Sequence, residues 1–576
     1  MHVVFRESHG LEETDTPVDL GQDPADLVVL SFSDSDLGAF AAGWHRAKGG
    51  LPSLRLANLV ALRHPLSVDT YVERTLSGAK GILIRLIGGE SYWPYGLAQV
   101  QDLARRHGIA LAILPADGRP DARLDALSTL PVSTLRRLSA LCEAGGAVAA
   151  QAALQQLALA AGLYAGPVPG DKSVPDMGYY RPGAGVVAAP EPGDKPLALV
   201  TFYRSYLTAA DTDPVDALIA ALEARGFSAA GLFATSLKDR AASDWIASEL
   251  GRLHPAAIVN ATAFSARSAD GAPSPLDAAG CPVFQVALST ARRRDWAGSD
   301  RGLAPSDLAM HVVLPEVDGR LFLGAISFKQ PGARDPDLSW SRFAHRADPG
   351  LVALAADRVA AWHRLATIPP AAKRLALILS TYPGKSHQLA HAVGLDALAS
   401  ANAILADLAE TGHDAGPVEN PGPRLIAEHL TWPVSAYLET LSTLPARLRG
   451  ALTEAWGAPE TDPSVTDGAF HFAALRTGRT LLALQPERGE VATRADDYHD
   501  LARTPRHAYV AFYLWLRAQG IDALIHIGAH GTLEWLPGKS VALSPDCWPA
   551  ALTGALPVLY PFIVNDPGEA AQAKRR

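Results

Sequence analysis

Two histidines and a glutamate stand four residues apart near the end of the sequence, at His526, His530 and Glu534. Imidazole and carboxylate side chains bind borderline divalent metals, and both can accept protons near neutral pH. The segment 523–527 is short, branched and apolar, and glycines bound it, which predicts a buried strand that opens into a loop. Open α/β sheets place their ligands at the carboxyl ends of strands, so we expect these side chains at such an end. The pattern indicates metal binding or proton transfer.

Less specific interpretations of the same residue types stay open. A single histidine near a strand end is more often a hydrogen-bonded core residue than a ligand. Glu534 could instead cap a helix that starts near Trp535. A zinc-protease motif is excluded because it needs a glutamate directly after the first histidine, where this chain has Ile527. His387 and His391 also have ligand spacing, but we interpret them as surface or capping residues.

Two Gly-Lys-Ser triplets, at 384–386 and 538–540, imitate a phosphate-binding loop. A true loop needs a second glycine five positions before the glycine of the triplet. Those positions hold Leu379 and Leu533. We therefore expect this chain to bind no ATP through either triplet.

Several long segments resemble the cobalt/magnesium chelatase large-subunit family, and they occur in the family's order. The strongest are the segment that carries the histidines and glutamate and the one that follows it. The segments are 522–539, 556–576, 81–96, 202–205, 393–396 and 507–515. Members of this family run to about twice the present length, so the resemblance implies an amino-terminal portion of a longer subunit.

The resemblance implies the tetrapyrrole-binding catalytic subunit of an ATP-dependent cobaltochelatase. Such a subunit inserts Co²⁺ into hydrogenobyrinic acid a,c-diamide, a corrinoid precursor of cobalamin. Its partners are an AAA+ ATPase subunit and a companion subunit, which use the ATP. The residues Trp-Leu-Pro-Gly at 535–538 favour a cobalt chelatase over the alternative, a magnesium chelatase porphyrin-binding subunit. A tetrapyrrole or metal carrier without insertion activity is a further alternative.

The resemblance also implies which residues do the chemistry. Glu534 is expected to be the base or metal-delivery ligand, followed by His530 and then His526. A macrocycle-binding role is also expected for Arg85, Tyr92 and Trp93, which could instead form a buried aromatic plug beside the turn at Gly88-Gly89. The same role is expected for Lys574, Arg575 and Arg576, which could instead be a solvated basic tail.

Composition indicates an ordinary globular protein. Of the 576 residues, 48% are hydrophobic, which is enough for several cores. A net charge of −9 and a pI near 6.1 supply no basic footprint for nucleic acid. No window approaches 18 apolar residues and the first residues lack a signal-peptide layout, so we expect a cytoplasmic protein without a membrane partner. Cys142, Cys281 and Cys547 are too few and too far apart for a disulfide framework.

Alternating strand and helix patterns predict a multidomain α/β protein with Rossmann-like parallel sheets and flanking helices. We expect an amino-terminal α/β domain over 1–165 and a linker rich in proline and glycine over 166–196. A Rossmann-like domain over 197–370 follows, and 371–576 forms the start of the core that carries the His/Glu motif. Residues 176–182 are unusually aromatic for a linker, so part of it should pack against a domain. The predicted strands are 26–31, 81–87, 110–115, 197–203, 231–233, 257–260, 282–286, 375–379 and 523–527.

Overall fold

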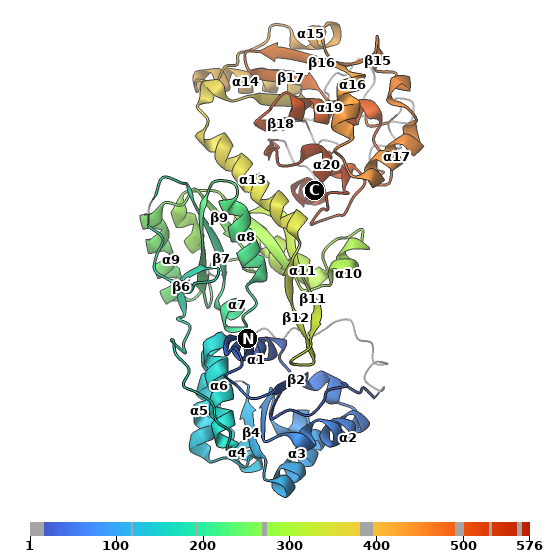
Figure 1. Ribbon diagram of the computed structural model, residues 1–576. Helices are drawn as coiled ribbons and strands as arrows, with labels where there is room; N and C mark the ends of the chain where they lie inside the picture. Colours follow the sequence, from blue (N-terminus) through green and yellow to red (C-terminus); the bar gives the residue numbers. More distant parts are fainter. Residues whose placement is uncertain are drawn as a thin grey trace.

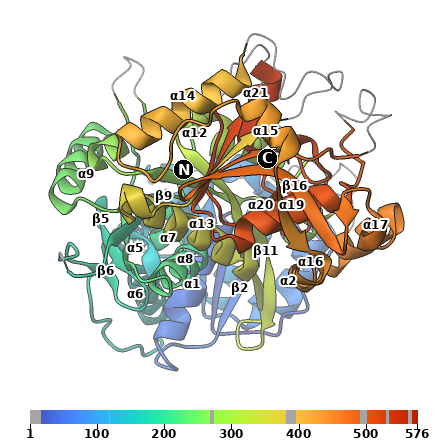
Figure 2. The ribbon, with the colours of Figure 1, turned by 90° about the horizontal axis from the view of Figure 1, so that it is seen from above.

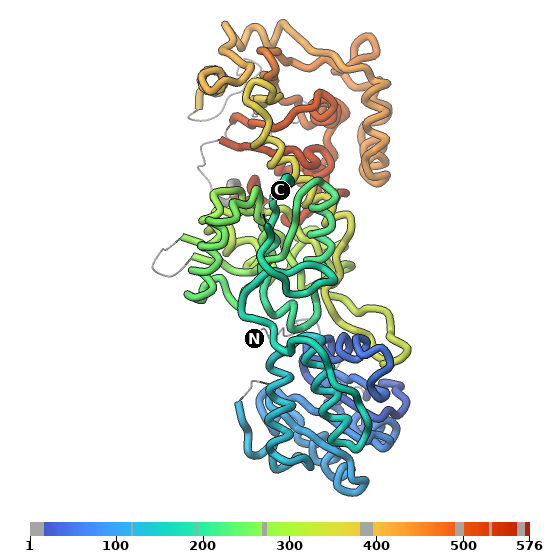
Figure 3. Tube along the Cα trace, turned by 60° about the vertical axis from the view of Figure 1, so that its left-hand side comes forward, coloured from blue at the N-terminus to red at the C-terminus, as the bar shows by residue number. Residues whose placement is uncertain are grey.

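The computed structural model describes residues 17–116, 119–191, 193–267, 273–380, 395–489, 500–528, 533–561 and 567–575, without the side chains of 567–570. These residues form three α/β units stacked in one row (Figure 1, Figure 3). Each unit has its own sheet with helices against it. The predicted fold class, multidomain α/β with parallel-rich sheets, is confirmed.

The first unit has a four-stranded sheet in the order β2-β1-β3-β4, with every pair parallel. Side chains alternate between the two faces of a strand, so Val28 and Leu30 of β1 pack with α2 and α3 while Leu27 and Val29 pack with α1 and α6. The elements are β1 Leu27–Ser31, α1 Asp34–Arg46, β2 Leu54–Asn58, α2 Pro65–Arg74, β3 Gly81–Leu86, α3 Pro94–His107, β4 Ala110–Pro115, α4 Ala122–Leu127, α5 Val132–Ala144 and α6 Gly146–Ala160.

The second unit has an eight-stranded sheet in the order β12-β11-β10-β9-β7-β8-β5-β6. Its centre, from β11 to β8, is parallel, and the antiparallel strands lie at the two edges. The strands are β5 Met177–Arg181, β6 Gly185–Val187, β7 Leu197–Tyr203, β8 Ser228–Ala234, β9 Ala257–Asn260, β10 Val283–Ser289, β11 Leu321–Asp335 and β12 Trp340–Ala347. The helices are α7 Arg204–Thr208, α8 Asp213–Glu223, α9 Arg240–Leu253, α10 Arg293–Ala297, α11 Pro305–Leu308, α12 Leu314–Glu316 and α13 Pro349–Thr367.

Two strands of this sheet, β5 and β6, lie inside the range 166–196 that the sequence indicates as a linker. Tyr179 and Tyr180 of β5 are buried, because β5 pairs with β8. The aromatic part of the range therefore packs against the second unit, as expected for 176–182. The domain limits themselves stay a prediction.

The hairpin of β11 and β12 extends from the second unit to the first (Figure 1). Leu338, near its tip, is fully buried in the hydrophobic cluster of the first sheet. Asp335 pairs with His45 at 2.5 Å, and Arg334 donates to the backbone oxygens of Leu20 and Gly21. The sequence patterns did not predict this hairpin.

The third unit follows α13, which runs from the second unit towards it (Figure 1). Its sheet has the order β14-β16-β17-β13-β18-β19, with β15 paired to β16 and a parallel part from β17 to β19. The strands are β13 Leu375–Leu379, β14 His429–Pro433, β15 Val465–Thr466, β16 Ala469–Thr477, β17 Thr480–Leu484, β18 Ala523–Ile527 and β19 Val558–Leu559. The helices are α14 Ala397–Glu410, α15 Pro421–Ala427, α16 Val434–Leu441, α17 Ala446–Trp456, α19 His507–Ala518, α20 Trp548–Thr553 and α21 Pro567–Arg575.

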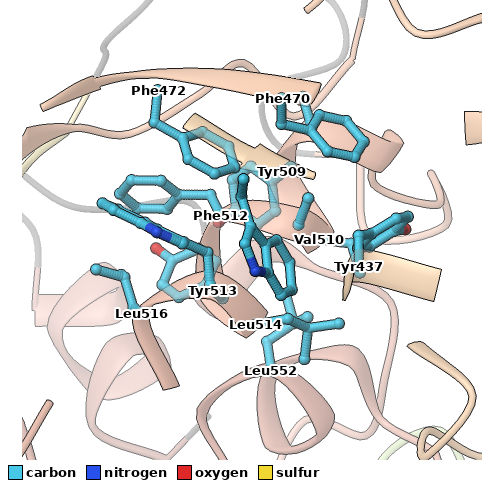
Figure 4. Packing of buried hydrophobic residues seen from close by; sticks show 14 of the residues in the cluster. Tyr437, Phe470, Phe472, Tyr509, Val510, Phe512, Tyr513, Leu514, Leu516 and Leu552 are labelled. Carbon is cyan, nitrogen blue, oxygen red and sulfur yellow. The ribbon is translucent and has the colours of Figure 1, made fainter. Parts of the chain in front are cut away.

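Helix α19 is the centre of this unit's core. Ten of its twelve residues, from His507 to Leu516, are buried. Figure 4 shows its aromatic side chains packed with those of neighbouring elements, such as Phe470 and Phe472 of β16 and Tyr437 of α16. A helix that is apolar all round must be enclosed, and α19 contacts strand β18 through Tyr513 and His526.

Seen from above, the third unit covers the second, with α14 and α19 over the row of units (Figure 2). Among the described residues, no helix has the length and apolar character needed to cross a membrane.

Candidate functional site

His526 lies where the sequence predicts it, at the carboxyl end of a buried parallel strand. Strand β18 pairs with β13 on one side and β19 on the other, and His526 stands opposite Ile378. A short 3-10 helix, η10 (Leu533–Trp535), carries Glu534 shortly after the strand ends. His530 falls in 529–532, outside the described residues. The topology thus explains two of the three positions.

The His526 ring lies beside two tyrosine rings, and its plane is nearly parallel to both. The centroid of Tyr513, from α19, lies at 6.1 Å and that of Tyr560, which follows β19, at 5.3 Å, both nearly parallel to the imidazole. His526 is fully buried, and burial lowers its pKa to about 4, so it is neutral at pH 7.

Hydrogen bonds around this stack decide where the imidazole hydrogen lies. Gln485 Nε2 donates to Tyr513 Oη at 2.5 Å, so the tyrosine hydrogen is available for His526 Nε2 at 3.3 Å. In this arrangement Nε2 accepts and Nδ1 carries the hydrogen. Nδ1 is buried without a partner among the described residues.

Glu534 is also buried, with 2% of its surface exposed. Its Oε1 accepts a hydrogen bond from Tyr560 Oη at 3.2 Å. Gln572 of α21 donates to the backbone oxygen of Glu534 at 3.3 Å. Tyr560 therefore contacts both His526 and Glu534 and connects the strand to η10. Within the described part of the chain, no group of three or more His, Cys, Asp or Glu is arranged to hold a metal ion.

A cavity of about 460 Å³ opens beside Glu534, between the second and third units. The third unit contributes Glu534, Tyr560 and Lys574 to its lining, and the second contributes Arg320, Arg358 and Trp362. The sequence patterns did not indicate a functional role for Tyr560, Arg358 or Trp362. Tyr560 lies in a family-like segment but was not selected, and α13, which carries Arg358 and Trp362, was not predicted. Sites between units that combine apolar walls with a few polar groups are typical of small-molecule binding.

The three basic residues at the end of the chain have different places. Lys574 is exposed and lines the cavity. Arg575 forms a two-pronged ion pair with Glu316 of α12, with distances of 3.0 and 2.8 Å, and so holds α21 against the second unit. Arg576 lies outside the described residues.

The amino-terminal candidates do not lie with Glu534. They belong to the first unit, at the opposite end of the row (Figure 1). Arg85 is buried between Asp36 and Glu143, at 2.7 and 2.6 Å, and lines a separate cavity of about 240 Å³. Trp93 is buried and donates to the Leu62 oxygen at 2.7 Å, as the alternative of an aromatic plug requires, while Tyr92 is 60% exposed.

The lysine of the second Gly-Lys-Ser triplet joins two units. Lys539 is buried, and its Nζ donates to the backbone oxygens of Trp296, Ala297 and Ser299 at 2.8, 3.0 and 2.8 Å. The ammonium group of Lys539 thus donates its hydrogen bonds to backbone carbonyls. The first triplet, 384–386, lies outside the described residues, as do His387 and His391.

The sheets and the cavity define a multidomain α/β protein with a buried acid and imidazole beside a site between two units. The family model described as CobN/magnesium chelatase matches residues 141–576. The chain belongs to this family.

Individual relatives agree with this assignment. The aerobic cobaltochelatase subunit CobN of Sinorhizobium sp is 38% identical over 610 residues, which cover 100% of this chain and 48% of that protein. A magnesium-chelatase subunit of Rhodobacter capsulatus is 28% identical over 66% of this chain and 34% of its own length. The catalytic subunit of cobaltochelatase from Mycobacterium tuberculosis superposes with a TM-score of 0.76 at 29% identity, over 95% of this chain and 46% of that one. The chain thus spans about half the length of the curated relatives it matches.

Proposed function

We propose that this chain carries the macrocycle-binding and metal-insertion site of an ATP-dependent cobaltochelatase, with Co²⁺ and hydrogenobyrinic acid a,c-diamide as substrates. The observation that supports this most directly is the buried Glu534, which reaches the cavity between two units and is oriented by Tyr560. The similarity to a cobaltochelatase subunit covers the whole chain.

Metal insertion requires a base. A divalent ion replaces two N–H hydrogens of the macrocycle, so two protons must leave as the metal–nitrogen bonds form. The Glu534 carboxylate is placed to accept one of them at the cavity wall, because Tyr560 holds Oε1 in a fixed direction, and the second proton leaves to solvent water. His526 is neutral and lies behind Tyr560, which contacts both the imidazole and Glu534. His530 completes the proposed metal-delivery set with His526 and Glu534.

The energy source is proposed to lie in partner subunits, an AAA+ ATPase and its companion, in the cytoplasm. Leu379 and Leu533 stand where a phosphate-binding loop needs glycine, and Lys539 is bound by carbonyl groups. The magnesium chelatase alternative is less favoured because the magnesium-chelatase relative from Rhodobacter matches only 66% of this chain.

The test replaces the base in the complete subunit that contains this chain. Glu534→Gln keeps the shape and removes the ionisable group. We expect macrocycle binding, followed by absorbance, to survive, while cobalt insertion with partner subunits and ATP falls by about 10² to 10⁴. Glu428→Gln, at a surface ion pair of the same unit, is the matched control and should insert cobalt normally.

Other outcomes separate the alternatives. Normal insertion by Glu534→Gln would remove Glu534 from the chemistry and move the role of base to His530. Tight macrocycle binding by the wild type without any insertion would identify a carrier. Insertion of magnesium into a porphyrin, but not of cobalt, would identify the magnesium chelatase.

A further inference from the structure

Arg358 lines the cavity from the second unit and contacts both sides of it. It lies on α13. Its Nη1 donates to the Leu323 oxygen at 3.0 Å within the second unit, and its Nε donates to the Gly554 oxygen at 3.2 Å in the third. These two acceptors are neutral carbonyls, and Nη2 has no hydrogen-bond partner among the described residues.

The charge of Arg358 lacks a counter-ion in the described part of the chain. The neighbouring cations are matched, because Arg320 pairs with Asp318 at 2.8 Å and Arg575 pairs with Glu316. Lys574 is exposed at the cavity and can be hydrated. Burial lowers the pKa of Arg358 to about 10, so the guanidinium stays charged at neutral pH. Arg358 is half-buried, and a charge partly removed from water without a counter-ion is unfavourable, so an anionic group entering the cavity would relieve this.

Trp362 indicates what else the ligand carries. It follows Arg358 by one helical turn, so both side chains lie on one face of α13. Both line the same cavity, and Trp362 is half-buried there. An indole beside a guanidinium suits a flat, apolar ring that bears an acidic side chain.

We propose that Arg358 binds a carboxylate on the rim of the macrocycle, with Trp362 against the ring, and thereby selects acidic over esterified side chains. This rests on the proposed function, because it assumes that a tetrapyrrole enters the cavity. A carboxylate can meet two N–H groups of a guanidinium at once, so the contact orients the ring as well as attracting it. Arg358 is then a specificity-determining residue supplied by the second unit.

The test compares two macrocycles on the complete subunit, hydrogenobyrinic acid a,c-diamide and its fully esterified form, by fluorescence titration. We expect the wild type to prefer the acid. Arg358→Gln should weaken acid binding by about ten- to a hundredfold, the usual loss for a hydrogen bond to a charged group. Its affinity for the ester should stay unchanged, whereas a merely structural role for Arg358 would weaken both equally.

A matched control lies on the same helix. Arg364 pairs with Asp522 of the third unit at 2.6 Å but does not line the cavity. Arg364→Gln should therefore keep the preference for the acid. If Arg358→Gln does not fold, Arg358→Lys replaces it, and we expect a several-fold loss for the acid alone because the two-pronged contact is lost.

Two results would overturn the proposal, and they differ in whether the proposed function fails with it. Unchanged acid affinity in the Arg358 variants would overturn the role of Arg358 while leaving the proposed function intact. Failure of the wild type to bind either macrocycle would overturn both.

Discussion

At the scale of single residues, Tyr560 connects the two described residues of the predicted triad. It stacks on His526 and donates to Glu534. The imidazole is fully buried beside two tyrosines, and this burial keeps it neutral, while the carboxylate lines the cavity. These different surroundings suit different tasks, since a neutral imidazole and an oriented carboxylate do not compete for the same proton.

The buried His526 predicts a loss of stability in mild acid. Its pKa is about 4 when folded, against an ordinary value of 6.5. Above pH 6.5 both states are neutral, but as pH falls from 6.5 to 4 only the unfolded chain gains the proton, so unfolding becomes easier. Replacing His526 with Phe keeps the stack and should make the free energy of unfolding about 2 kcal/mol less sensitive to a change from pH 7 to 5.

Urea titrations at the two pH values measure this difference. His429→Phe, at an exposed position of β14, is the control and should leave the pH dependence unchanged. Equal pH dependence in the wild type and His526→Phe would show that the imidazole is not shielded from water. His345, whose pKa burial lowers to about 3, adds a similar acid sensitivity in the second unit and is present in all three proteins.

At the scale of elements, the β11–β12 hairpin and α13 join the units. The hairpin buries Leu338 in the first unit's core, and α13 carries the cavity residues towards the third. Both elements belong to the second unit, so the second unit contacts both of its neighbours through them. The lengths of these elements, 15 residues for β11 and 19 for α13, allow them to reach beyond their own unit.

Truncating Leu338 should weaken the attachment of the hairpin to the first unit. Leu338→Ala removes a fully buried side chain, which typically costs about 2 to 5 kcal/mol. We expect an earlier urea transition and faster cleavage by proteinase K in residues 161–176, which connect α6 of the first unit to β5 of the second. Leu314→Ala, at a side chain 38% exposed, should change neither. Unchanged cleavage in Leu338→Ala would mean that other contacts hold the first unit in place.

At the scale of the whole molecule, the cavity beside Glu534 exists only where the second and third units meet. Arg358, Arg575 and Lys539 each form contacts across this junction. A ligand that binds there should therefore stabilise the junction more than either sheet alone.

Hydrogen exchange of the complete subunit with and without macrocycle tests this arrangement. We expect slower exchange in α13, α20 and β19, whose residues line the cavity, and no change in β1 to β4 of the first unit. A control without macrocycle but with Co²⁺ separates the effect of the metal. Protection centred on β3 instead would place the macrocycle at Arg85 and Trp93, as the family resemblance had suggested.

Much of the fold was readable from local pattern. Strands such as 110–115, 197–203, 375–379 and 523–527 have the predicted bounds, because a buried parallel strand is a short apolar run between glycines and polar residues. His526 lies at the end of such a run and Glu534 follows a few residues later, which is why both were selected, and their role in the site stays a prediction. Local pattern could not reveal β5 and β6 as strands, because β5 pairs with β8, more than 50 positions away, and β6 pairs with β5.

Only the tertiary structure decided which residues share a site. Arg358 and Trp362 precede Glu534 by more than 170 positions, and their spacing along the sequence holds no trace of the cavity that they line with it. Arg85 and Trp93 were further candidates for macrocycle binding, yet the order of the units places Arg85 in another cavity and Trp93 in another core. Residue type and spacing determine which chemistry a side chain offers, whereas the packing of separate units determines which side chains meet.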